Sequence, residues 1–239
     1  MNKISKKRKE LLLELEQKLG YTFSKLYLLD RALTHSSYAN QEGLSYVEHN
    51  ERLEFLGDSV LSIVISEHIF KKYKTKPEGK LTRIRAGIVC ESSLYECAKG
   101  IDLGKYMLIG KGEEMTGGRT RVSILADAFE AVIAAIYIDG GLDKVRDFVI
   151  RSLSKSIKGA VKDRLMNDYK TELQEIVQRE QGSIIEYKVT GEDGPDHDKV
   201  FYVAVDVNGR TVGNGHGKSK KEAEQEAAKS AISLMSEKK

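Results

Sequence analysis

Residues 124–138 constrain the fold of this chain most, because they form one apolar segment, ILADAFEAVIAAIYI, whose only charged residues are Asp127 and Glu130. A helix that is apolar on nearly all sides is buried inside a protein. We therefore predict a central helix here, with other helices packed around it. Its two carboxylates need compensation, because an isolated buried charge costs several kcal/mol.

A second segment carries three further acids on one face. Residues 50–73 have apolar side chains at three- and four-residue spacing, which predicts a helix with Asn50 as its N-cap. Glu51, Glu54 and Asp58 are spaced i, i+3 and i+7, so they project from one side of this helix. No lysine lies among them, as a solvated face would normally have. We expect these acids to line a groove beside the core.

If the acids of the two helices meet, four or five carboxylates share one pocket, and like charges at that density favour divalent cations. Ligation by oxygen alone is typical of Mg²⁺, with Mn²⁺ as a substitute, rather than of zinc. Such clusters occur in enzymes that hydrolyse phosphodiesters, where the metal ions activate water and stabilise the leaving oxygen. The alternative is that an arginine simply pairs with the acids, the candidates being Arg52, Arg83 and Arg85.

The first two thirds of the chain predict helices throughout. Beside the two segments above, helical patterns cover residues 7–19, 29–38, 79–99 and 142–157, and the predicted central helix runs over 123–138. The glycine-rich residues 110–120 predict an exposed loop.

Beyond residue 160 the pattern changes from helical spacing to alternation. One more helix is predicted over residues 169–180, then strands over 184–189, 200–207 and 210–213, and a final helix over 219–235. Asn208-Gly209 is a strong hairpin signal between the last two strands. We predict an all-α domain over residues 1–160, followed by a small α+β domain of order α-β-β-β-α over residues 168–239.

Residues 49–61, HNERLEFLGDSVL, closely resemble the signature of bacterial ribonuclease III, and residues 125–131, LADAFEA, resemble that family's second acidic motif. The resemblance implies a helical catalytic domain whose homodimer cuts both strands of double-stranded RNA with Mg²⁺. It also implies products with 5′-phosphates, 3′-hydroxyls and short 3′ overhangs, and a role in processing ribosomal precursor and other structured RNAs.

The resemblance assigns roles by position. The metal-site carboxylates it implies are Glu54, Asp58, Asp127 and Glu130, with Asp58 and Glu130 the catalytic pair. Two further acids match the family pattern and rank lower, as outer-shell or RNA-orienting groups: Glu51 and Glu78. Phe55 has two interpretations of equal weight, namely packing in the core and a dimer contact that inserts into the partner subunit.

Residues 169–175, 194–201 and 213–228 together resemble a double-stranded RNA-binding domain. Such a domain touches two successive minor grooves and bridges the phosphates between them. The resemblance implies that Gln174 and His197 reach the minor grooves. It also implies phosphate contacts by the lysines at the start of the last helix, which are Lys218, Lys220 and Lys221.

Charge does not by itself identify this tail as an RNA-binding domain. Residues 168–239 carry 11 basic and 14 acidic side chains, and acids stand in the last helix where the pattern often has basic residues: Glu222, Glu224 and Glu226. Taken alone, the three lysines would be read as the solvated start of a helix.

Several other classes of protein are disfavoured. No apolar run is long enough to span a membrane, and the first ten residues lack the apolar core of a secretory signal, so we expect a cytoplasmic protein. Residues 112–119 nearly match a phosphate-binding loop but lack its lysine and preceding strand, so no nucleotide cofactor is expected. The histidines His35, His49 and His68 have no spacing typical of metal ligands.

Two rivals to a nuclease were weighed. One is a protein that only binds RNA, and the presence of all the expected acids argues against it. The other is a helical regulator with an acidic calcium site, which leaves the tail unexplained.

Overall fold

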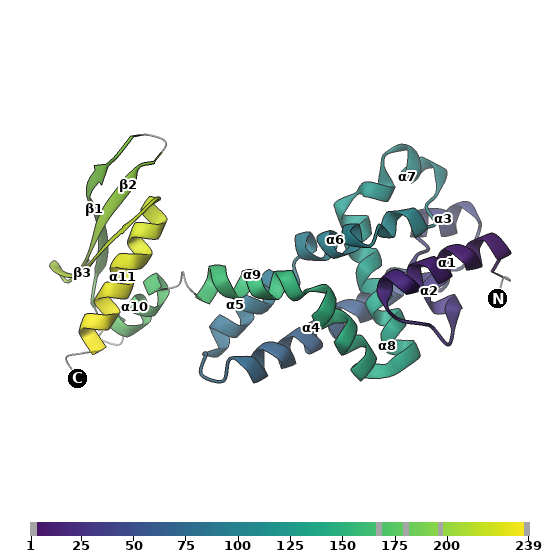
Figure 1. The fold of residues 1–239 in the computed structure, drawn as a ribbon, viewed down its shortest axis with the longest axis horizontal. Coiled ribbons are helices and arrows are strands. Elements are labelled where there is room, and N and C mark those ends of the chain that lie inside the picture. The colour runs from purple at the N-terminus through teal and green to yellow at the C-terminus, as the bar shows by residue number, and fades with distance from the viewer. Residues whose placement is uncertain (1–3, 166–168, 179–181, 196–197, 237–239) are drawn as a thin grey trace. The chain divides into compact units, whose positions relative to one another are not determined.

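The computed structural model describes residues 4–165, 169–178, 182–195 and 198–236. The chain divides into two compact units, Met1–Ala160 and Val161–Lys239. The first unit is helical, and the second contains a three-stranded antiparallel sheet with helices (Figure 1). An all-α part followed by a small α+β part is the predicted fold class, which is confirmed. Among the described residues, no helix combines the length and the apolar character that crossing a membrane requires.

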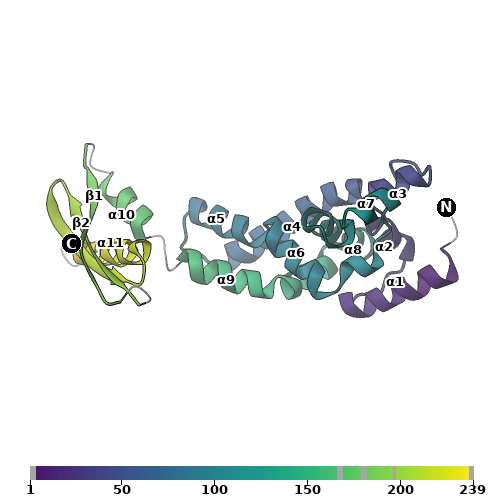
Figure 2. The same ribbon diagram turned by 90° about the horizontal axis from the view of Figure 1, so that it is seen from above.

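The helical unit is built around α8 (Val122–Ser152), as predicted for the central apolar segment. Nearly all side chains from Ile124 to Ile136 are buried. Helices α2 (Leu26–Ala32), α4 (Glu51–Lys72) and α6 (Glu91–Gly100) pack against it, as the two views of Figures 1 and 2 show.

Helices α4 and α8 touch at their backbones. A Cβ atom added at Gly57 would lie only 2.0 Å from the carbonyl oxygen of Glu130. No larger residue fits there without moving one helix away from the other. This close approach brings the acidic turns of the two helices side by side.

Two breaks in the helical unit differ from the prediction. The single helix expected over residues 29–38 is wrong, because α2 ends before His35, which is extended with ψ 151° and starts α3 (Ser36–Gln41). The cause is a backbone bridge, in which His35 N–H donates to Leu108 O (3.0 Å) and Leu108 N–H to Leu33 O (2.8 Å). The helix expected over residues 79–99 is likewise two helices, separated at the extended Cys90.

Other helices of the unit begin or end at residues that differ from the prediction. Helix α8 is kinked at Gly141 (φ 79°) and ends at Ser152, so the helix expected over residues 142–157 gives way to a new helix α9 at Ser154. Residues 110–120 are mostly exposed, as predicted, yet they form a short helix and a 3-10 turn rather than a loop. The other elements of the unit are α1 (Lys6–Leu19), α5 (Glu78–Ile88), α7 (Lys111–Met115), α9 (Ser154–Leu165) and the 3-10 turns Leu103–Tyr106 and Gly118–Thr120.

The second unit has the predicted order α-β-β-β-α. Its elements are α10 (Tyr169–Val177), β1 (Ile185–Asp193), β2 (Val200–Val207), β3 (Arg210–Gly217) and α11 (Lys220–Ser236), with the strands in the order β1-β2-β3. Val203 and Val205 of β2 join Leu173 and small residues of α11 in its core. Helix α11 lies directly on β3, because a Cβ at Gly215 would lie 2.1 Å from the backbone nitrogen of Ala227.

Candidate functional site

The acids of α4 and α8 meet beside the contact of their backbones. Glu54 of α4 is half-buried and Asp58 is exposed one turn later, while Asp127 and Glu130 of α8 are half-buried. The face of α4 that carries the acids continues into fully buried Leu61. The acids therefore lie at the edge of the core, as their spacing predicted.

Burial and mutual repulsion set the electrostatics of this cluster. Burial, which is the largest cause, and the charges of Asp58, Glu54 and Asp127 together raise the pKa of Glu130 to about 7. Burial also raises the pKa of Glu54, again with neighbouring carboxylates adding to the effect. The pKa of Asp127 is raised by its burial and by the charge of Glu91. Charges act on one another in this way only over about 10 Å or less, so the four carboxylates share one site.

An arginine partner does not account for Glu130. A guanidinium held against Glu130 would lower its pKa, and the pKa is raised instead. Arg85 donates a hydrogen bond to Ser66 Oγ (3.0 Å). A group of carboxylates that raise one another's pKa fits a hard divalent cation.

The carboxylates are not gathered into a coordination shell. Within the part of the chain that the structure describes, no three His, Cys, Asp or Glu side chains stand close enough together to hold a metal ion. Carboxylates repel one another when no cation lies between them. Rotation of their side chains is enough to change the distances between the carboxylate groups.

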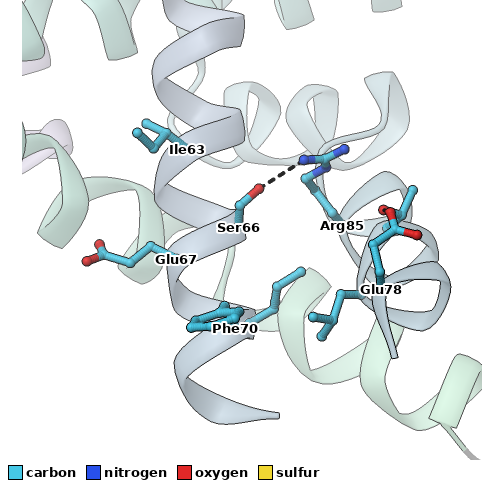
Figure 3. A pocket seen from close by; sticks show the side chains of 9 residues that line it. Ile63, Ser66, Glu67, Phe70, Glu78 and Arg85 are labelled. Carbon is cyan, nitrogen blue, oxygen red and sulfur yellow. Dashed lines mark hydrogen bonds between the residues drawn. The ribbon is translucent and has the colours of Figure 1, made fainter. Parts of the chain in front are cut away.

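The two lower-ranked acids lie in different places. Glu51 is the exposed first residue of α4, and its charge adds to the raised pKa of Glu54. Glu78 begins α5, where its carboxylate accepts a hydrogen bond from Thr82 Oγ1 (2.7 Å). It lines a cavity with Phe70 and Arg85 (Figure 3). Glu51 therefore joins the edge of the acid cluster within the chain, whereas Glu78 belongs to this cavity.

The charges of two of these acids, Glu51 and Asp127, also act on His35, for which no role at this site was predicted. The pKa of His35 is lowered by burial, and the charges of Glu113, Glu51 and Asp127 act on it in the opposite direction. The signal that could have found it is the pair of serines that follows, because a polar side chain at a helix start often caps the helix.

The RNA-binding residues predicted in the second unit are exposed wherever they are described. Gln174 lies on α10, and Lys220 and Lys221 are the first two residues of α11. Ser219 Oγ accepts the backbone N–H of Glu222 (3.2 Å) and so caps that helix. His197 lies outside the described residues.

Two of these lysines already have contacts within the unit. Lys218 Nζ lies 3.1 Å from Asp198 Oδ1 in an exposed ion pair. Lys220 Nζ lies 5.7 Å from the centre of the Phe201 ring. Both contacts are at the surface and leave the ammonium groups open to solvent.

The unexpected acids of α11 have structural uses. Glu224 Oε2 lies 2.6 Å from Lys170 Nζ and so ties α11 to α10. Glu226 pairs with Lys229 one turn along the same helix at 3.3 Å. Both carboxylates are thus neutralised locally, which reduces their repulsion of a polyanion.

Comparison with known proteins identifies both units. Residues 26–157 match a family model described as ribonuclease-III-like, and residues 169–235 match the double-stranded RNA binding motif. The chain is 50% identical over 222 residues to Ribonuclease 3 of Clostridium beijerinckii, covering 93% of this chain and 95% of the relative. It belongs to the ribonuclease III family.

Further relatives agree with this assignment. Ribonuclease 3 of Listeria innocua is 48% identical over 222 residues, which cover 93% of this chain and 96% of that protein. The solved nuclease domain of ribonuclease III from Campylobacter jejuni is 40% identical, with a TM-score of 0.56, over 60% of this chain and 96% of the solved one. The resemblance stated from the two acidic motifs is confirmed, and the chain is an endoribonuclease of this family with a double-stranded RNA-binding motif.

Phe55 of this ribonuclease III chain does not pack in the core. Its side chain is 77% exposed on α4, so the core-packing interpretation fails for a single chain. Ile63 and Phe70 of the same helix are 57% and 70% exposed. Beside them lies a cavity of about 470 Å³ between α4 and α5, and Figure 3 shows Ile63 and Phe70 at its wall.

Proposed function

We propose that this ribonuclease III hydrolyses double-stranded RNA with divalent cations bound by Glu54, Asp58, Asp127 and Glu130. Mg²⁺ is the natural ion and Mn²⁺ its substitute, because the donors are all carboxylate oxygens. The observation that carries the proposal is the main-chain contact of α4 and α8 at Gly57, which sets the half-buried Glu54 beside the helix of Asp127 and Glu130; the raised pKa of Glu130 supports it. Ionised carboxylates held in this way oppose folding, and a bound cation would compensate their charge.

The residues of the chain divide the work of catalysis. A bound cation would supply a Lewis acid that activates water for in-line attack on phosphorus and stabilises the departing 3′-oxygen. Near neutral pH the Glu130 carboxyl is partly protonated, so binding of a cation releases its proton. Asp58 lies on α4 and Glu130 on the facing helix α8, and both would hold the cation. No covalent intermediate with the enzyme is needed, and the products carry 5′-phosphates, 3′-hydroxyls and short 3′ overhangs.

The two units have separate tasks in this proposal. Residues 1–160 form the catalytic domain, and residues 168–239 hold the duplex through Gln174, His197 and the lysines at the start of α11. The backbone N–H groups of a helix start also favour phosphate. We propose that the protein works in the cytoplasm on ribosomal precursor and other structured RNAs.

We further propose a homodimer formed along α4. One acid cluster serves one strand, whereas cutting a duplex needs two sites, and two-fold symmetry provides the second. The solved Campylobacter jejuni domain has a region involved in dimer formation. Phe55, Ile63 and Phe70 of α4 are exposed and apolar, and the cavity beside them has apolar side chains in its wall. In the proposed dimer, Phe55 of one protomer enters the cavity of its partner. Glu78 of that cavity is thereby brought close to the shared surface.

Replacing Phe55 with aspartate should convert the dimer to a monomer, because a charge would be buried in the apolar contact. The side chain is exposed in the single chain, so each protomer should keep its fold. Sedimentation equilibrium measures the mass. Met115, which is 87% exposed on α7, provides the matched control, and Met115→Asp should remain dimeric. A monomeric wild type with full activity would refute the dimer.

The decisive experiment is incubation of the protein with a long RNA duplex and Mg²⁺, alongside single-stranded RNA and a DNA duplex. We expect cleavage of the RNA duplex alone, loss of cleavage with a chelator, and recovery with added Mg²⁺ or Mn²⁺. End labelling should detect the 5′-phosphates. Binding of the RNA duplex without any cleavage would favour the rival in which the chain only binds RNA.

A further inference from the structure

Lysines gather where α4 ends and α5 begins. Residues 71–80, KKYKTKPEGK, hold five lysines and a single acid, and we call this segment the lysine turn. Lys71 lies 2.6 Å from Glu67, whereas no ion pair within the described part of the chain holds Lys74 or Lys76. A run of lysines by itself indicates only a solvated surface, so its use depends on what lies opposite it in the dimer.

The exposed apolar side chains of α4 determine how two copies of this helix would pair. Phe55, Ile63 and Phe70 lie within about 80° of arc, because each residue turns the helix by about 100°. Ile63 stands in the middle of this stripe, eight residues after Phe55 and seven before Phe70. The cavity proposed to receive the partner's Phe55 has Phe70 in its wall (Figure 3). The two copies of α4 would therefore run antiparallel, with Ile63 near the two-fold axis.

This pairing would place the lysine turn of one protomer beside the acids of the other. Along α4, Lys72 follows Phe70 by two residues, and Glu54 precedes Phe55 by one. In an antiparallel pair, the residues that follow Phe70 in one copy lie beside those that precede Phe55 in the other. Within one chain, by contrast, Asp58 and Lys72 are fourteen residues apart, which is about 21 Å along the helix. The lysines thus face the acid site of the partner rather than their own.

We propose that the lysine turn binds RNA phosphates beside the acid site of the partner subunit, with Lys72, Lys74 and Lys76 as positioning residues for the strand cut there. The inference rests on the proposed dimer and cation site. Ammonium groups bind phosphate oxygens as point charges, so they would fix where the strand lies over the acids. They would also offset the repulsion between the carboxylates and the RNA backbone. Each active site would then take residues from both protomers.

Heterodimers of two differently tagged full-length chains test this arrangement. Glu130→Gln in one protomer leaves a single working site, so a duplex is nicked in one strand only. If Lys72, Lys74 and Lys76 are changed to glutamine in that same protomer, the working site of its partner loses its lysines. We expect nicking at saturating RNA to be about tenfold slower, because a small displacement of reacting groups can cost up to about 10²-fold. The reverse heterodimer, with the three substitutions in the protomer that keeps Glu130, should nick about tenfold faster than the first.

Both heterodimers lack three lysines, so their affinities for duplex RNA should be equal, and the rate at saturation decides between them. The matched control changes three exposed lysines of α1 to glutamine in the Glu130→Gln protomer, namely Lys6, Lys7 and Lys9. It removes the same charge and should leave the nicking rate unchanged.

Equal nicking rates in the two heterodimers would overturn the inference. A slower rate in the reverse heterodimer would overturn it too, because the lysines would then serve the site of their own chain. In both cases the dimer and the cation site would stand. A monomeric wild type, or cleavage by a dimer with Glu130→Gln in both protomers, would instead overturn the proposed function and this inference with it.

Discussion

In the helical unit the proposed functional charges are carboxylates that repel one another and are mostly half-buried, whereas in the second unit they are exposed lysines at a helix start. The pKa of Glu130 is raised to about 7 by burial and its neighbours. Lys221 and Lys220 stand in solvent. Charges of the first kind persist only because the packing of two helices forces them together, and each has a large effect. The exposed lysines cost little folding free energy, and each contributes a small share of the affinity for RNA.

The largest effect should come from the acids. Glu130→Gln and Asp58→Asn should each lower the cleavage rate about 10³-fold or more, because each would remove a ligand of the proposed cation. Binding of duplex RNA, measured by fluorescence anisotropy with Ca²⁺ in place of Mg²⁺, should stay within about twofold, since the RNA-binding lysines are untouched.

Glu67→Gln is the control for these variants, because Glu67 is an acid of the same helix that is paired with Lys71 (2.6 Å) and Arg146 (3.0 Å). It should cleave at nearly the wild-type rate. Near wild-type cleavage by either site variant would remove the basis of the metal-site assignment.

Removing the second unit should have the next largest effect. A chain that ends at residue 167 should bind duplex RNA more than about tenfold more weakly at 0.15 M salt, yet still cleave at low salt. The reason is that phosphate contacts weaken steeply with salt, while the proposed cation site lies wholly in the helical unit. Cleavage rates at two salt concentrations check this. If cleavage is lost equally at both, the division of labour is wrong.

A smaller effect is expected from two lysines alone. Lys220→Ala with Lys221→Ala should reduce the slope of log affinity against log salt by roughly 1 to 2 units, if each lysine neutralises about one phosphate. Different duplex sequences should be weakened alike. Lys229→Ala is a control from the same helix, where Lys229 is paired with Glu226. A slope that does not change would mean that the two lysines are only solvated.

The smallest expected effect is on the stability of the fold, where variants of the two units should differ. Because the pKa of Glu130 is raised in the folded state, folding binds a proton between pH 4.5, its ordinary value, and about 7. The stability of the metal-free wild type should therefore fall as pH rises through that range. Glu130→Gln should remove this loss and raise the Tm by a few degrees at pH 8, measured by differential scanning calorimetry. The double lysine variant should leave the Tm unchanged, and a lower Tm for Glu130→Gln would contradict the repulsion.

The sequence predicted the elements whose signal is periodic and strong. The buried helix around residues 124–138 and the acidic face of α4 are where their spacing placed them, because burial repeats with the helical period. The strands of the second unit were found from their alternation and from the turn at Asn208, although β3 runs four residues further than predicted, to Gly217.

The parts that failed depend on contacts between distant residues. No proline or glycine marks the break before His35, which a bridge to Leu108 produces. His35 caps α3, and the two serines that follow it are a sequence signal of that role, but nothing along the chain indicates that the charges of Glu51 and Asp127 act on its ring. The place of Glu78 likewise depends on how α5 folds back on α4, which spacing along the chain does not reveal.

The contact at Gly57 has a consequence for how this protein tolerates change. Side chains elsewhere in the core can be exchanged for others of similar volume, and neighbouring rotamers absorb the difference. At Gly57 the main chains themselves touch, with 2.0 Å left for any added atom, so rotamers offer no relief. The distance between the two main chains that carry the carboxylates is thus set by direct contact at Gly57. Any variant that keeps glycine at position 57 should keep this distance between the two helices.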